Sequence, residues 1–182
     1  MQNNIEKVVI DEFGEQWCEL PENEGYYGSI EVLQDIFGPL EDVENMKGLR
    51  IAEIGAGSGR LINMFAAAGA KEIVAIEPSD AMTPMKEYTA SFADRIQYVQ
   101  MKGDEWNHPN LDYIFSIGVL HHIYDPIPTV ENAFKNLKPG GKMFPTTGTI
   151  HALPFTDAGE VQRRSLRTIE PLPHRVQCPH FR

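Results

Sequence analysis

The clearest sign of a ligand-binding site in this sequence is a set of three glycines at alternate positions. They are Gly55, Gly57 and Gly59, and they follow a short apolar run. Glycine lets a backbone turn tightly and approach a ligand that a Cβ atom would obstruct. Glu53 adds a carboxylate beside the turn, which suits a cationic ligand and opposes a pyrophosphate. Arg60 stands where the dinucleotide fingerprint G-x-G-x-x-G has its third glycine, so the pattern does not favour a dinucleotide.

Glu77 is a second acid that points to a nucleotide-like ligand. It ends the next apolar run, 18 residues after Gly59. An acid at the end of the second strand of an α/β unit accepts hydrogen bonds from ribose hydroxyls. A ribose-bearing ligand with positive charge is therefore expected.

An α/β sheet is needed to bring these residues to one edge. Short apolar runs alternate with helix-period segments from Leu49 onward. The predicted strands cover 49–54, 72–76, 96–101 and 111–116, with a fifth beginning near Lys142. This alternation predicts an α/β fold with a doubly wound, mainly parallel sheet and helices on both faces, and such sheets bind ligands at the carboxyl ends of their strands.

Capping residues indicate where the helices begin. Asp125 and Pro126 are typical of an N-cap followed by a first helical residue. For the helix after the second strand, either Ser79 is the cap, or Thr83 is the cap and Pro84 the first residue.

The segment ahead of the first strand is rich in aromatic residues. Phe13, Trp17, Tyr26 and Tyr27 precede an apolar pattern over 30–37 that predicts a short amphipathic helix. We expect residues 1–47 to form a cap or lid over the mouth of the site. Packing of these aromatics on the edge of the sheet is the alternative.

The last segment, Pro145–Arg182, differs from the core at 48–144. It contains five prolines and five arginines but no lysine, and its apolar periodicity stops. We expect this tail to be irregular from about His151 onward, so that the C-terminal end of the sheet is incomplete or atypical. An open edge after the fifth strand exposes unpaired backbone groups, which predicts dimerisation or poor solubility.

Composition narrows the environment and the partners. The chain is 42% hydrophobic and 23% charged, with no apolar stretch long enough for a membrane span and no secretory signal at its start. Its two cysteines, Cys18 and Cys178, lie far apart, which fits a reducing compartment. The net charge of −10 disfavours binding of phosphate backbones. We therefore expect a cytoplasmic protein with a small-molecule partner, no nucleic acid and no membrane.

Taken together, five motifs in order resemble those of the class I S-adenosylmethionine-dependent methyltransferases, over about residues 48 to 144. The motifs are Glu53 to Gly59, Glu77-Pro78-Ser79, Gly103-Asp104, the stretch 111–116 with Leu120-His121-His122, and the turn at 136–142. The resemblance implies a Rossmann-like methyltransferase core that uses S-adenosylmethionine and yields S-adenosylhomocysteine.

Roles for individual residues are implied by the same resemblance. The glycine loop would line the methionine moiety, with Glu53 near its amino group, and Glu77 would hold the ribose. The full implied set is Glu53, Gly55, Ala56, Gly57, Gly59, Glu77, Pro78, Asp104, Glu105, Trp106, Ser116, Ile117 and Gly118. Asp104 would meet the adenine amino group with Glu105 and Trp106 beside the ring, while residues 116–118 would border the sulfonium. A solvated loop acid is the alternative for Asp104, and simple edge packing is the alternative for Trp106.

The expected reaction is in-line transfer of the methyl group to a small-molecule acceptor. A protein that binds the cofactor without transferring the methyl is the first alternative, and a nicotinamide-dependent oxidoreductase is the second. His122 is the candidate catalytic base, although one histidine of the pair 121–122 could instead brace the loop. His151, His174 and His180 lack ligand spacing, so no metal site is expected.

Overall fold

A five-stranded parallel sheet organises the protein, whose computed structural model describes residues 2–19 and 23–146. The strand order is β3-β2-β1-β4-β5, and every neighbouring pair is parallel. The strands are β1 (Arg50–Ile54), β2 (Glu72–Ile76), β3 (Ile96–Val99), β4 (Leu111–Ile117) and β5 (Leu137–Thr146). Because the order reverses at β1, the loops after β1 and β4 diverge at the carboxyl edge and leave room for a ligand.

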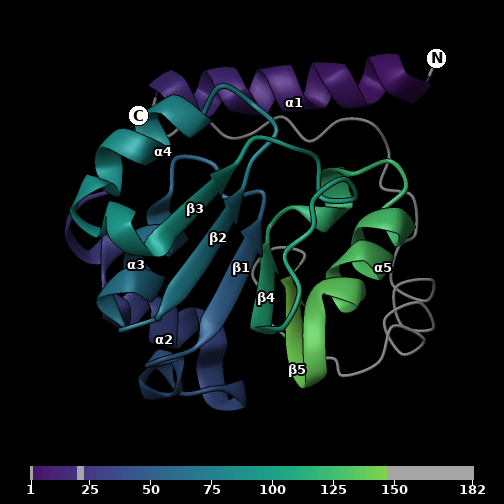
Figure 1. Ribbon diagram of the computed structural model, residues 1–182. Coiled ribbons are helices and arrows are strands. Elements are labelled where there is room, and N and C mark those ends of the chain that lie inside the picture. Colours follow the sequence, from purple (N-terminus) through teal and green to yellow (C-terminus); the bar gives the residue numbers. More distant parts are fainter. Residues whose placement is uncertain (1, 20–22, 147–182) are drawn as a thin grey trace.

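Helices connect the strands and cover the sheet (Figure 1). The α-helices are α1 (Gln2–Glu19), α2 (Ile30–Phe37), α3 (Arg60–Ala67), α4 (Met82–Tyr88) and α5 (Ile127–Asn136). Short 3-10 turns occupy Gly25–Gly28, Gly38–Leu40, Val43–Met46, Ala90–Arg95 and Leu120–His122. None of the helices in the described part of the chain combines the length and apolar character needed to span a bilayer.

Two apolar clusters lie on opposite faces of the sheet. Ile51 and Ile73 belong to the cluster that includes residues of α2, α3 and α4, whereas their neighbours Ala52 and Val74 join the cluster under α5. Successive residues of a strand point to opposite faces, so β1 and β2 must be apolar along their whole length. The doubly wound fold predicted from the sequence is confirmed.

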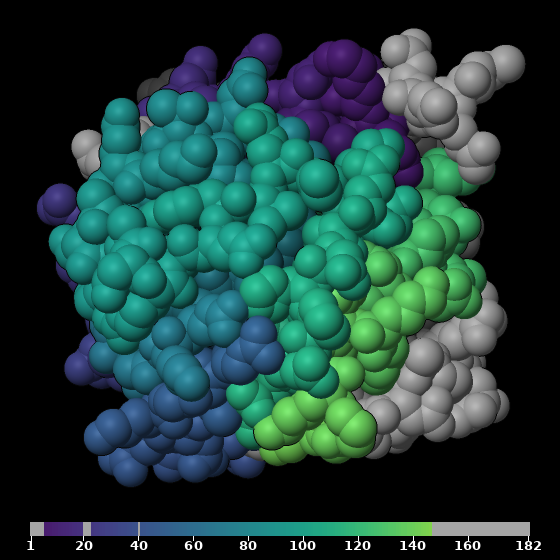
Figure 2. All heavy atoms as spheres, viewed as in Figure 1, coloured from purple at the N-terminus to yellow at the C-terminus, as the bar shows by residue number. Residues whose placement is uncertain are grey.

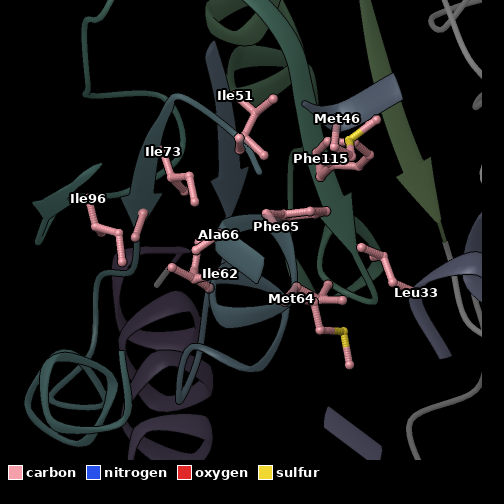
Figure 3. Packing of buried hydrophobic residues seen from close by; sticks show 14 of the residues in the cluster. Leu33, Met46, Ile51, Ile62, Met64, Phe65, Ala66, Ile73, Ile96 and Phe115 are labelled. Carbon is pink, nitrogen blue, oxygen red and sulfur yellow. The ribbon is translucent and has the colours of Figure 1, made fainter. Parts of the chain in front are cut away.

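Stacked aromatic rings hold β4 and β5 against α2 and α3. Phe115 of β4 has its ring centroid 4.6 Å from that of Phe65, 5.4 Å from that of Phe37 and 4.9 Å from that of Phe144. Figure 3 shows Phe65 and Phe115 among the buried apolar side chains of this core, with Phe115 next to Met46. The side chains are fully buried, and burial at this density anchors β4, one of the strands whose carboxyl ends carry the site.

Several element boundaries differ from those predicted. The fifth strand begins at Leu137 and not near Lys142, because Leu137 pairs with Leu111 before an irregularity in the register restores pairing at Tyr113 and Lys142. Gly140 takes a positive φ of 78° within that irregular stretch. The third strand is shorter than predicted, ending at Val99.

Helix starts are also displaced from the predicted positions. α5 begins at Ile127, one residue later than predicted, although the Asp125 carboxylate still accepts a hydrogen bond from the Ile127 N–H at 3.2 Å. α4 begins at Met82 with Ala81 as its N-cap, so neither Ser79 nor Thr83 caps it. The predictions for the tail after residue 146 lie outside the described residues.

Candidate functional site

The loop between β1 and α3 takes the conformation that its glycines predict. Gly55, Gly57 and Gly59 have φ values of 77°, 53° and 88°, in the region that favours glycine. The N–H groups of Gly55 and Ala56 donate to the Ile76 carbonyl at 2.8 and 3.0 Å. These bonds fasten the loop to the end of β2.

Glu77 connects the end of β2 to the same loop. One oxygen of its carboxylate accepts from the Gly57 N–H at 2.9 Å. The other accepts from the Ser79 N–H at 3.0 Å and from the Ser79 hydroxyl at 2.6 Å. The side chain is buried, yet it also contributes to the wall of the cavity described next.

A cavity with about 1000 Å³ of empty space, part of it open to solvent, lies at the carboxyl edge of the sheet. Seven of the residues predicted to form the site line it: Gly55, Glu77, Pro78, Asp104, Ile117, Gly118 and His122. The structure therefore brings together the ends of β1, β2 and β4 and the loop after β3, as the sequence motifs predict. The other predicted residues, Glu53, Ala56, Gly57, Gly59, Glu105, Trp106 and Ser116, are not part of the lining.

Glu53 and Ser116 are buried next to residues of the cavity wall, and each has a polar atom without a hydrogen-bond partner among the described residues. These atoms are Glu53 Oε2 and Ser116 Oγ. Burial raises the pKa of Glu53 to about 8, with the Arg60 guanidinium opposing this change and Glu77 adding to it. Unsatisfied buried acceptors are costly and rare in proteins. In the cavity wall itself, the carboxylates of Glu77 and Asp104 offer hydrogen-bond acceptors and negative charge to a ribose-bearing cation such as S-adenosylmethionine, so the residues present fit this cofactor.

Trp106 is placed in the core and not beside the cavity. Its indole is almost fully buried in the cluster under α5, and its N–H donates to the Gly103 carbonyl at 2.8 Å. Glu105, its neighbour, is exposed. Of the residues 104–106, Asp104 is the one that lines the cavity.

Helix α1 lies across the top of the sheet in Figure 1, and its atoms are the purple ones at the top of Figure 2. Its side chains form one side of the cavity at the carboxyl edge of the sheet. Phe13 and Trp17 line the cavity, and a Cβ atom on Gly57 would lie 3.2 Å from the Trp17 indole nitrogen. Glu6 of α1 forms an ion pair with Lys102 at 2.8 Å, and both residues belong to the cavity wall. The aromatic residues of the N-terminal segment therefore include two that cover the site.

Sequence reasoning missed α1 as a helix and missed Glu6, Val9, Ile10 and Lys102 as cavity residues. A signal was present, since positions 9, 10, 13 and 17 are apolar and share one face of a helix. Lys102 had no such signal, because its role depends on α1 docking against the loop after β3.

His122 is at the cavity wall, while His121 is not. The two rings lie 3.9 Å apart, and the ring of Phe13 lies 4.6 Å from that of His122. Burial lowers the pKa of both histidines, and the charge of His121 lowers that of His122 further. The lowered pKa favours the neutral form of His122, which is able to accept a proton.

Within residues 2–19 and 23–146, no group of three or more histidine, cysteine, aspartate or glutamate side chains lies close enough together to hold a metal ion. His151, His174 and His180 lie outside the described residues.

Comparison with known proteins assigns the family. A family model described as a methyltransferase domain matches residues 52–143. "Probable histone-arginine methyltransferase 1.3" of Arabidopsis thaliana is 33% identical over 153 residues, which covers 72% of this chain and 28% of that protein. "Histone-arginine methyltransferase CARMER" of Anopheles gambiae is 32% identical over 127 residues, covering 67% of this chain and 20% of that protein.

Solved structures agree with this assignment. Haemonchus contortus phospholethanolamine N-methyltransferase 2, solved with phosphomonomethylethanolamine and S-adenosylhomocysteine, superimposes with a TM-score of 0.52 at 25% identity, over 64% of this chain and 27% of that one. The chain thus spans less than a third of the length of these relatives.

One prediction about partners is wrong by these comparisons. A small-molecule acceptor, with no nucleic acid among the partners, was expected from the net charge of −10. The matched curated relatives are named for histone arginine, a residue of a protein. Negative charge disfavours phosphate backbones, but it attracts a basic protein, so the charge did not exclude a macromolecular substrate.

Three findings point to the same family: the match to the methyltransferase model, the hydrogen bond between the glycine loop and Glu77, and the parallel sheet. A nicotinamide-dependent oxidoreductase, the second alternative, is not the family that the model identifies. The chain belongs to the class I S-adenosylmethionine-dependent methyltransferases.

Proposed function

We propose that this protein transfers a methyl group from S-adenosylmethionine to a basic nitrogen of a protein substrate, with the arginine side chain as acceptor. The observation that carries the proposal is the charge of the cavity wall. Among the described residues, the wall contains one lysine, Lys102, and four carboxylates, which belong to Glu6, Glu77, Asp104 and Asp125. A cavity lined with carboxylates stabilises a cationic cofactor and a guanidinium acceptor at close range. The names of the matched relatives support the same acceptor class.

Positioning is the main contribution that the chain's residues make to the reaction. The cofactor supplies an electrophilic methyl carbon on a positively charged sulfur, which leaves with the electron pair of the broken carbon–sulfur bond. Glu77 and Asp104 orient the ribose and adenine ends, and Ile117 with Gly118 borders the methyl group. Holding two reactants close and aligned is worth roughly 7 to 11 kcal/mol of the barrier. Helix α1 covers one side of the cavity with Phe13 and Trp17.

His122 receives the proton in this proposal. Formation of the new nitrogen–carbon bond leaves an extra proton on the acceptor nitrogen, which must pass to a base. His122 lines the cavity, as Gly118 does, and partial burial lowers the pKa of its ring, which favours the neutral form. His121, whose ring is 3.9 Å away but which does not line the cavity, provides a matched control.

A methylation assay with paired peptides tests the proposal. The chain is incubated with methyl-labelled S-adenosylmethionine and an arginine-rich histone tail peptide, or with the same peptide in which every arginine is lysine. We expect label on the arginine peptide, a large loss of rate in His122→Gln and a smaller loss in His121→Gln. Gly57→Val, which strains the loop and clashes with Trp17, serves as the control that does not bind cofactor.

Two results would contradict the proposal. Label on the lysine peptide at the same rate would show that a guanidinium is not the preferred acceptor. Cofactor binding without label on either peptide would favour the first alternative, a binding protein that does not transfer the methyl.

A further inference from the structure

The imidazole of His122 is restrained by contacts between rings. It lies on the short turn Leu120–His122 and remains partly exposed, and a side chain in such a place has several rotamers open to it. The ring of His121 lies 3.9 Å away, and the ring of Phe13, from α1, lies 4.6 Å away at an angle of 59°. Within the described part of the chain, the hydrogen bond of His122 is a backbone one, from its N–H to the Val119 carbonyl at 2.9 Å. Phe13 therefore supplies a restraint on this imidazole from outside its own turn.

The neighbour of Phe13 in α1 is a glycine that the packing requires. Gly14 is buried, and a Cβ atom on it would lie 2.8 Å from the Ser79 Cβ, which cannot move without its backbone. Glycine inside a helix costs about 1 kcal/mol relative to alanine, so α1 is a weaker helix in return for this close approach. The Ser79 hydroxyl in turn donates to the Glu77 carboxylate at 2.6 Å. The contact therefore places α1, and Phe13 with it, against the loop that follows β2.

Trp17 makes a second contact that fixes the same part of α1. It follows Phe13 by four residues, which places both rings on one face of the helix, and both line the cavity. A Cβ atom on Gly57 would lie 3.2 Å from its indole nitrogen. The position of Phe13 is thus set by contacts on either side of it, to the loops after β1 and β2. His122, in the loop after β4, meets a ring whose place is already determined.

We propose that α1 positions the proton acceptor, because Gly14 seats the helix on Ser79 and the Phe13 ring then holds the His122 imidazole at the cavity wall. Phe13 is a positioning residue, which acts on methyl transfer through His122. The inference rests on the proposed function, in which His122 receives the proton. Misplacement of a group at the site by about 1 Å costs up to about 100-fold in rate, so loss of this contact has a measurable effect.

A double-mutant cycle measures whether Phe13 acts through His122. We expect Phe13→Leu, which keeps apolar bulk at the wall, to lower kcat for the arginine peptide about tenfold. The KM of the peptide and the Kd of S-adenosylhomocysteine should change less than about twofold. In the His122→Gln background, the same substitution should change kcat less than about twofold. An equal loss of kcat in both backgrounds would overturn the inference.

Two further variants show whether the ring or the stability of the helix matters. Phe13→Tyr keeps an aromatic ring at this position and should retain most of the rate. Val8→Ala, on the exposed side of α1, should leave kcat unchanged. A loss of rate in Val8→Ala as large as that in Phe13→Leu would overturn the inference.

Gly14→Ala separates close docking from helix stability, because the two predict opposite results. Alanine stabilises the helix by about 1 kcal/mol, so helix stability alone predicts a rate at or above that of the wild-type chain. Displacement of α1 from Ser79 predicts a lower kcat instead. A rate at or above the wild-type value would overturn the inference.

Nuclear magnetic resonance tests the contact without a substrate. The Phe13 ring shifts the imidazole proton signals of His122, which are identified by their loss in His122→Gln. We expect these signals to move in Phe13→Leu, while those of His108, which contacts Glu72 at the start of β2, stay in place. Unmoved His122 signals would overturn the inference and leave the proposed function intact. Moved signals without label on the arginine peptide would overturn the proposed function, and with it the role of Phe13 in catalysis.

Discussion

Glu77 both supports the glycine loop and lines the cavity, whereas Asp104 only lines the cavity. The Glu77 carboxylate holds the N–H groups of Gly57 and Ser79 and also faces the cavity, whereas Asp104 is an exposed side chain of its wall. In the proposed pose Glu77 also accepts from a ribose hydroxyl, and Asp104 accepts from one adenine amino group. A charged hydrogen bond contributes roughly 1.5 to 3 kcal/mol.

We therefore predict that Glu77→Ala weakens S-adenosylhomocysteine binding more than Asp104→Ala does, as measured by calorimetry. Glu77→Ala should also lower the melting temperature of the ligand-free chain, because the buried Gly57 N–H loses its acceptor. If Asp104→Ala weakened binding more, the ribose and adenine would have to be placed differently along the sheet edge.

Glu53 gives the ligand-free protein an unusual dependence of stability on pH. Its pKa is about 8 in the folded state, above its ordinary value of 4.5, so the folded chain holds a proton that the unfolded chain releases. This contribution to stability is fully present below about pH 4.5 and is lost as the pH rises through about 8.

We predict that the free energy of unfolding falls by a few kcal/mol more in the wild-type chain than in Glu53→Gln between about pH 5 and pH 8, since one pKa unit corresponds to about 1.4 kcal/mol. Urea denaturation of both chains at several pH values measures this difference. Parallel curves for the two chains would mean that Glu53 ionises normally in the folded state.

Among the elements, α1 determines how the site is closed. It meets the core through Trp17 over the glycine loop, through Gly14 against Ser79 and through the Glu6–Lys102 ion pair. The ion pair is partly exposed and contributes about 1 kcal/mol or less. Packing of Phe13 and Trp17 at the cavity is therefore expected to contribute more than the ion pair.

We predict that Trp17→Ala speeds dissociation of S-adenosylhomocysteine about tenfold, which corresponds to about 1.4 kcal/mol. Val8→Ala, on the exposed side of the same helix, should leave the rate unchanged. Stopped-flow measurement of ligand release compares the two. An equal effect of both substitutions would show that helix stability, and not cover of the cavity, controls release.

At the scale of the whole molecule, the net charge of −10 shapes encounters with a basic substrate. Charges act over a Debye length of about 30 Å at 0.01 M salt but only about 8 Å at 0.15 M. Long-range attraction raises association rates by tenfold or more at low salt.

We predict that the association rate of an arginine-rich peptide falls at least about tenfold when the salt concentration rises from about 0.01 M to about 0.15 M. The affinity for S-adenosylhomocysteine, which binds within the cavity, should change much less. Surface plasmon resonance with both ligands tests this contrast. A peptide association rate that does not respond to salt would contradict a role for the net charge in substrate capture.

The sequence by itself determined the features that depend on neighbouring residues. The range Glu72–Ile76 of β2, the helix over 30–37, the left-handed glycines of the loop and the parallel order of elements all follow from local patterns of apolar residues and turns. Because parallel strands end at one edge, these patterns also predicted that Gly55, Glu77, Asp104 and Gly118 would meet at one cavity.

Only the tertiary structure decided which side chains are buried and what charge they carry. Glu6 and Lys102 pair across 96 positions of sequence, and no local pattern connects them. Trp106 has the same neighbours in sequence whether it faces a ligand or the core, and packing under α5 places it in the core. The raised pKa of Glu53 comes first from its burial, which no local pattern around residue 53 reveals. Burial is a property of the assembled chain, so it appears only when distant segments meet.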